Sequence, residues 1–148
     1  MSRDAYWLES IRRFYRQLDE ALYARGESCR RCGECCRFDR TGHVLYASRL
    51  ERLYLLRISP RPEGGGDGEG LIARGLRCPF QAGSRCLARE GRTLGCRLHF
   101  CSGLDGDFSE RWHRLLKRLH DDLGLAWSYV PLLPLDPEPG GEWQDASG

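Results

Sequence analysis

Eight cysteines crowd the middle of this chain, and they constrain its fold more than any other feature. All eight lie between Cys29 and Cys101 of a chain of 148 residues. Cysteine at such local density is typical of chains that disulfides or metal ions hold together. Apolar residues make up 41% of the sequence, and this figure includes the eight cysteines. The other apolar side chains are therefore too few to build a large hydrophobic core. The sequence therefore predicts that sulfur chemistry stabilises the middle region.

The cellular compartment decides between disulfides and metal. The residues up to Leu22 keep interrupting apolar positions with charged ones, unlike a secretory signal. The longest uncharged apolar-rich run, Leu125 to Leu135, has 11 residues and contains a proline, which is too short for a membrane helix. We therefore expect a cytoplasmic protein that does not enter membranes, with reduced thiols that bind metal. A disulfide scaffold is the alternative.

The segment Cys29-Arg-Arg-Cys32-Gly-Glu-Cys35-Cys36 carries the clearest ligand spacing. Two consecutive Cys-x2-Cys steps allow one loop to wrap a single metal centre. The same run resembles the start of a bacterial ferredoxin motif, in which a later Cys-Pro pair supplies a further ligand. Cys78, which precedes a proline, offers such a pair. Because adjacent side chains of an extended backbone point to opposite sides, Cys35 and Cys36 suit two neighbouring centres.

Eight thiolates are the right number for two centres with four ligands each. One partition assigns the first centre to Cys29, Cys32, Cys35 and Cys78, and the second to Cys36, Cys86, Cys96 and Cys101. The alternative is one centre that uses four of the cysteines, with the others free or redox-active.

Together these segments resemble the YkgJ-type cysteine-cluster proteins, a family described as zinc- or iron-chelating domains and named for a CxxCxxCC motif. Cys29 to Cys36 matches CxxCGxCC, and Cys78-Pro-Phe80 matches the CPF element of that family. Residues 86–97 match the segment C-x-I-Y-x-x-R-P-x-x-C-R at Cys86, Arg92, Cys96 and Arg97, but Arg89 replaces the usual tyrosine and Thr93 the usual proline. The resemblance covers Cys29 to Cys101. It implies metal binding by the eight cysteines and does not imply a reaction.

Hydrophobic periodicity predicts helices outside the cysteine segments. Apolar side chains recur at helical spacing over residues 7–22 and 107–123, and a capping-box sequence opens a further helix over 48–59. Glycine or proline follows each of these stretches. We therefore expect a mostly α, small, loop-rich single domain over residues 1–136, with about three helices around a cysteine-rich metal core. Residues 137–148 are expected to form a disordered tail.

The four histidines give weaker signals. His99, between two of the cysteines, could replace one of them as a ligand, although an ordinary structural role is favoured because eight thiols are available. His43 is expected to line the first cysteine loop. His113 and His120 are expected at the edge of the polar face of the last helix. No Ser/His/Asp grouping or HExxH sequence indicates a catalytic site, and no glycine-rich phosphate loop is present.

A net charge of +2 excludes a strongly basic nucleic-acid binder. The leading hypothesis is a metal-binding protein with an iron–sulfur cluster of the 4Fe-4S type, in electron transfer, redox chemistry or metal handling, with a redox or client protein as partner. The three-cysteine run and the Cys-Pro pair favour this hypothesis, because ordinary zinc ribbons pair two Cys-x2-Cys knuckles. A zinc-stabilised protein-interaction module and an iron–sulfur enzyme of unknown substrate are the alternatives.

Overall fold

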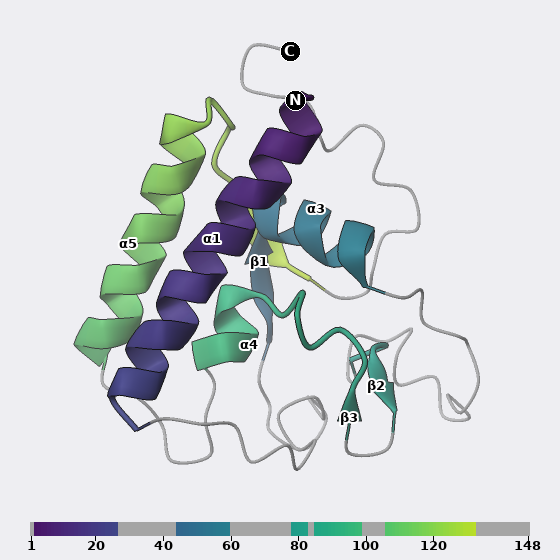
Figure 1. Ribbon diagram of the computed structural model, residues 1–148, viewed down its shortest axis with the longest axis vertical. Helices are drawn as coiled ribbons and strands as arrows, with labels where there is room; N and C mark the ends of the chain where they lie inside the picture. Colours follow the sequence, from purple (N-terminus) through teal and green to yellow (C-terminus); the bar gives the residue numbers. More distant parts are fainter. Residues whose placement is uncertain (1, 27–43, 60–77, 83–84, 99–105, 133–148) are drawn as a thin grey trace.

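The computed structural model describes residues 2–26, 44–59, 78–82, 85–98 and 106–132 (Figure 1). Its elements in chain order are α1 (Arg3–Ala24), β1 (Tyr46–Ser48), α3 (Arg49–Ile58), β2 (Gln81–Ala82), β3 (Arg85–Cys86), α4 (Leu94–Leu98), α5 (Gly106–Asp122) and β4 (Tyr129–Pro131). The expected mostly helical class is confirmed. No helix within these ranges has the length and apolar character that crossing a membrane requires. The predicted tail at 137–148 lies outside the described residues.

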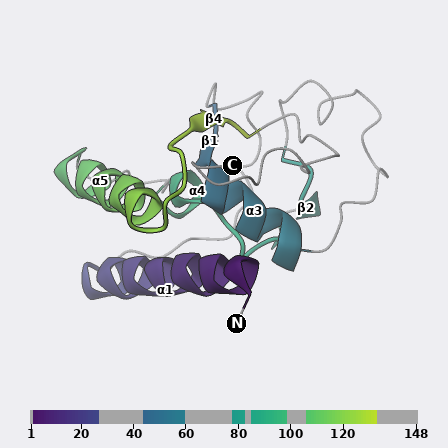
Figure 2. The ribbon, with the colours of Figure 1, turned by 90° about the horizontal axis from the view of Figure 1, so that it is seen from above.

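The first helix has clear local signals at both ends. The Ser2 hydroxyl caps its start by accepting a hydrogen bond from the Ala5 amide at 3.2 Å. At its end, Gly26 takes a positive φ of 76°, a conformation that costs glycine little. Between them, α1 buries one face against α3 and α5, and α1 and α5 lie side by side (Figures 1 and 2).

The helices pack on an apolar core rather than on cysteine. Phe14 of α1 contacts Trp112 of α5 edge to face, with ring centroids 5.6 Å apart. The helix cluster, as we call this core, contains no cysteine among the described residues; its members with no exposed surface are Ile11, Leu18, Leu50, Leu94 and Leu116. The expected arrangement of helices around a cysteine-rich core therefore does not describe this part of the molecule. Packing of large apolar side chains holds it together.

The chain after α5 returns across the fold. A positive φ of 70° at Gly124 ends the turn after α5, and β4 then pairs antiparallel with β1. The Leu132 amide extends this pairing by donating to the Leu45 carbonyl at 2.8 Å. Leu125 and Leu132 are both buried, so this segment packs against the core at both of these residues.

The capping box that opens α3 is present as predicted. The Glu51 amide donates to the Ser48 hydroxyl at 3.3 Å, and the Ser48 amide donates to the Glu51 carboxylate at 3.0 Å. Strand β1 ends at Ser48, so the cap also fixes the angle between strand and helix.

His120 lies in the interior, and its expected position at the edge of the polar face of α5 is wrong. Its side chain is fully buried, and Nε2 accepts a hydrogen bond from the Leu50 amide at 3.2 Å. Nδ1 lies 2.9 Å from the Leu116 carbonyl, which assigns the ring proton to Nδ1. The Leu50 amide belongs to the first turn of α3, where no intrahelical acceptor is available, so the neutral ring satisfies it and joins α5 to α3.

Burial lowers the pKa of His120 from the ordinary value, and the nearby Arg49 lowers it further. Well above pH 6.5 the ring is neutral in both folded and unfolded chains. As the pH falls below that value, the unfolded chain binds a proton before the folded protein does, so stability is lost with decreasing pH.

We therefore predict that the free energy of unfolding falls between pH 7.5 and 5.5, with a contribution from His120 of up to about 1.4 kcal/mol per pH unit. In His120→Gln, whose amide oxygen can still accept from Leu50, the decrease should be shallower. Urea unfolding at a series of pH values measures this. His113→Gln, at a ring that is only partly buried, should keep most of the dependence. Equal slopes for the wild type and His120→Gln would contradict the assignment.

Candidate metal centre

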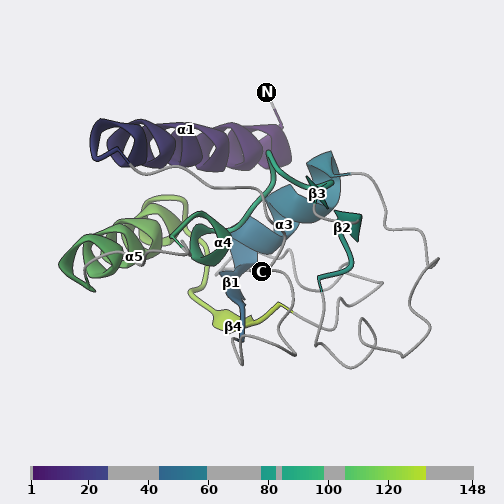
Figure 3. The same cartoon turned by 90° about the horizontal axis from the view of Figure 1, so that it is seen from below.

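Three of the eight predicted ligands lie within the described residues, and all three contact one apolar cluster. Cys78 is a buried member of this cluster, and Cys86 and Cys96 pack against it. The remaining members of this second cluster are Leu45, Ala47, Leu55, Phe80, Ala88 and Leu132. The β2–β3 hairpin lies on the opposite side of α3 from α5 (Figure 3). Three thiols from separate segments thus contact the same apolar cluster.

A tight hairpin positions the first two thiols. Cys86 stands opposite Gln81 in the register of β2 and β3, and the Leu87 amide donates to the Phe80 carbonyl at 2.8 Å. Phe80 is almost completely buried in the second cluster and anchors this turn. Cys78, just before the hairpin, is 7% exposed.

Thr93 holds the third thiol at the start of α4. The Cys96 amide donates to the Thr93 hydroxyl at 3.3 Å, as in a helix N-cap, and this hydroxyl lies 3.4 Å from the Cys96 sulfur. The Thr93 side chain therefore supplies both a cap for α4 and a hydrogen-bond donor beside the sulfur.

The surroundings of Cys96 keep its thiol protonated. Burial raises the pKa of this thiol to about 11, although the hydrogen bonds from Thr93 oppose this shift and nearby Cys86 adds to it. Without a bound cation the thiol is neutral at pH 7 and contributes only as a small apolar side chain. Because metals bind the deprotonated thiolate, a metal at Cys96 would have to displace this proton. Thiolate sulfur is the ligand type that zinc and iron–sulfur sites share.

The remaining predicted ligands, Cys29, Cys32, Cys35, Cys36 and Cys101, lie outside the described residues, as do His43 and His99. Within the described ranges, no group of three or more His, Cys, Asp or Glu side chains is arranged to hold a metal. The partition of the cysteines into two centres stays a prediction.

Behind α4, the carboxylate of Glu51 is completely buried. It accepts hydrogen bonds from the Tyr15 hydroxyl at 2.9 Å and from the Leu94 amide at the start of α4, in addition to its capping bond with Ser48. Burial raises the pKa of Glu51, and these hydrogen bonds oppose that effect. The sequence predicts the capping bond, because the partner is three residues away. It does not predict the bonds to Tyr15 and Leu94, because both partners are distant along the chain.

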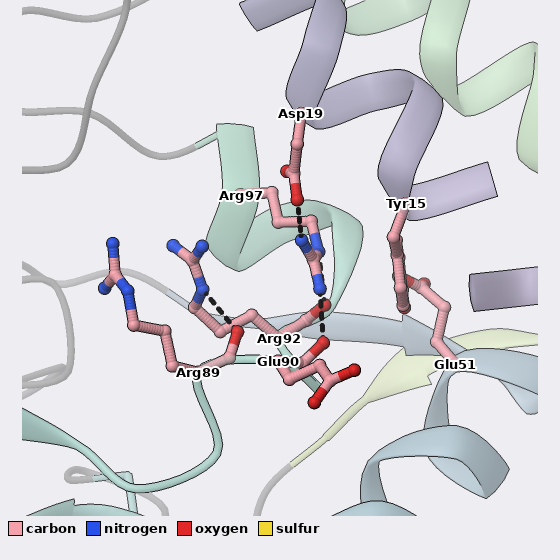
Figure 4. Close-up of polar contacts among 7 residues, drawn as sticks. All are labelled: Tyr15, Asp19, Glu51, Arg89, Glu90, Arg92 and Arg97. Atoms are coloured by element: carbon pink, nitrogen blue, oxygen red, sulfur yellow. Dashed lines mark hydrogen bonds and ion pairs between the residues drawn. The ribbon is translucent and has the colours of Figure 1, made fainter. Parts of the chain in front are cut away.

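Arg97 forms the other half of this polar network (Figure 4). Its guanidinium donates to the Asp19 carboxylate at 2.6 Å, to the Arg92 carbonyl at 2.8 Å and to the Glu90 carbonyl at 2.5 Å. The same group lies 4.0 Å from the centroid of the Tyr15 ring. Because Arg97 and Cys96 are neighbours on α4, the network fixes the position of that thiol relative to α1.

Comparisons with models of protein families, with curated proteins and with solved structures find no match to this chain.

We predict that Glu51→Gln lowers the free energy of unfolding by about 2 kcal/mol, because the amide NH₂ of glutamine would replace an acceptor and leave a buried donor without a partner. Chemical denaturation at pH 7 measures the change. The matched control is Glu110→Gln, at a carboxylate that is 66% exposed, where a change within about 0.5 kcal/mol is expected. Similar losses in the two variants would show that the buried network has no special role.

Proposed function

We propose that this protein binds metal through its cysteine cluster, with an iron–sulfur cluster of the 4Fe-4S type as the bound group, and acts in electron transfer, redox chemistry or metal handling. The packing of Cys78, Cys86 and Cys96 around one apolar cluster is the observation that carries the proposal. The spacing of the five other cysteines, and the resemblance to the YkgJ-type family, are consistent with it.

Energetic considerations support metal as a stabilising element of the cysteine region. The second cluster contains fewer large side chains than the helix cluster, and its three cysteines lie in or beside short elements, the two-residue strands β2 and β3 and the five-residue helix α4. A structural metal site can contribute on the order of 10 kcal/mol to folding. Such a contribution would secure a region in which apolar packing is limited.

The described residues have distinct roles under this proposal. Cys78, Cys86 and Cys96 would each supply a thiolate, and the Thr93 hydroxyl would donate a hydrogen bond to the Cys96 sulfur. Hydrogen bonds to ligand sulfurs are one of the means by which a protein adjusts the reduction potential of an iron–sulfur cluster. A bound cluster of this kind would supply one-electron chemistry.

A zinc-stabilised interaction module is the second candidate, and exposed apolar side chains at the β1–β4 pair favour it. Val44 and Tyr46 are 57% and 41% exposed, and Val130, which pairs with Ala47 and therefore lies on the other face from Tyr46, is 50% exposed. Tyr46 stacks on Tyr129, with ring centroids 5.7 Å apart. An exposed aromatic and aliphatic surface is typical of a contact with another protein.

Metal analysis of protein purified without oxygen distinguishes the candidates. We expect brown protein with iron and acid-labile sulfide, and Cys96→Ser or Cys78→Ser should lower the metal content and the melting temperature together. Colourless protein with stoichiometric zinc would instead support the interaction module.

Ala88→Ser is the matched control for these variants. It introduces a hydroxyl at a buried position of the same apolar cluster but removes no thiol. It should therefore keep the full metal content, even if its melting temperature decreases slightly. Full metal content in both Cys96→Ser and Cys78→Ser would refute their assignment as ligands.

A further inference from the structure

A hollow of about 690 Å³ lies on the surface beside α4, between α1 and the turn that leads into α4. This volume is within the range of small-molecule sites, about 300–1,000 Å³. Five arginines and three carboxylates line it, together with the side chains of three tyrosines. Its lining is therefore polar and carries an excess of positive charge, and it is separate from the predicted metal ligands.

Two of these arginines have partners within the protein. Arg97 donates hydrogen bonds to the Asp19 carboxylate and to two backbone carbonyls, so the carboxylate of Asp19 is already paired. Arg12 pairs with Glu9 at 3.0 Å on the exposed face of α1. These two contacts compensate the charges of Arg97 and Arg12, so the uncompensated positive charge of the hollow lies at its other arginines.

Arg89, Arg92 and Arg16 are the three other arginines of the hollow, and Arg89 and Arg92 are neighbours on the turn before α4 with unused donors. Within the described parts of the chain, the Arg89 guanidinium has no hydrogen bond or ion pair, and Arg92 donates only through Nε, to the Arg89 carbonyl at 2.9 Å. The two guanidiniums extend in the same direction, whereas the carboxylate of Glu90 points away from them (Figure 4). Their terminal nitrogens form adjacent hydrogen-bond donors in the hollow.

Arg92 is partly buried beside two other guanidiniums. Burial lowers the pKa of its guanidinium, and repulsion from Arg97 and Arg89 lowers it further. The hydrogen bond to the Arg89 carbonyl holds the side chain in place despite this repulsion. A fixed pair of guanidiniums is pre-organised for the two oxygens of a carboxylate or phosphate group, because each can present two parallel N–H donors.

We propose that Arg89 and Arg92 form a binding site for the oxyanion group, phosphate or carboxylate, of a small molecule. The rest of the ligand would occupy the hollow against the ring of Tyr54, which also lines it. This anion site is separate from the proposed metal site, and anion binding does not depend on the proposed metal function.

Calorimetric titration of the full chain with inorganic phosphate and, separately, with succinate tests the site and distinguishes the two oxyanions. We expect saturable binding of at least one anion at low ionic strength. Arg89→Gln should weaken it about tenfold through the loss of charge-assisted hydrogen bonds. Arg92→Lys, which keeps the charge but loses the planar fork, should weaken it as well.

Arg114→Gln is the matched control, because it makes the same change of charge at a side chain that is 70% exposed on α5. It should bind the anion as the wild type does. Melting temperature and metal content, measured for every variant, separate loss of the site from loss of the fold.

In the wild type, the anion should shift the backbone amide signals of residues 89–92 and leave those of α5 unchanged. Absence of saturable binding of both anions overturns the proposal. It is also overturned if Arg114→Gln weakens binding as much as Arg89→Gln does, or if the shifted amide signals lie elsewhere.

Discussion

The buried carboxylate of Glu51 is the interaction on which much of this structure depends. Removing a carboxylate from water is costly unless hydrogen bonds replace its hydration. Here the donors come from Tyr15 of α1, Ser48 at the end of β1 and Leu94 of α4. One side chain therefore ties together three segments that are distant in the sequence. Any arrangement that displaced one of these segments would leave a buried polar group without a partner.

The same network joins the two apolar clusters. Helix α4 contributes Leu94 to the helix cluster, while Cys96, two residues later, packs against the second cluster. Arg97 then returns to α1 through Asp19. A metal bound at Cys96 would thus be mechanically connected to the helices, and the proposed anion site at Arg89 and Arg92 lies on the turn just before α4.

Local sequence signals predicted the helices α1, α3 and α5, but not the five-residue helix α4, which is a fourth helix where about three were expected. The capping box at Ser48, the apolar stripe of α1 and the glycine that ends it all act within a few residues, so their consequences can be read from the chain directly. His120 was assigned wrongly because periodicity placed it at a polar edge, whereas its partner is the Leu50 amide, 70 residues earlier. The three described cysteines were recognised as a set from their spacing, but their common contact with the second cluster depends on the packing of β1, α3 and the β2–β3 hairpin.

The sequence by itself determined where the three longer helices lie, which side chains are apolar enough to be buried, and which sulfur atoms are available as ligands. These properties follow from short-range hydrogen bonding and from side-chain chemistry. Only the tertiary structure decided which buried polar groups become partners: Glu51 with Tyr15, Arg97 with Asp19, and His120 with α3. Such pairs depend on where whole helices lie against one another, and the hydrophobic packing that sets those positions is not directional. Hydrophobic packing specifies that a face is buried, but it does not specify which distant donor or acceptor that face will contact.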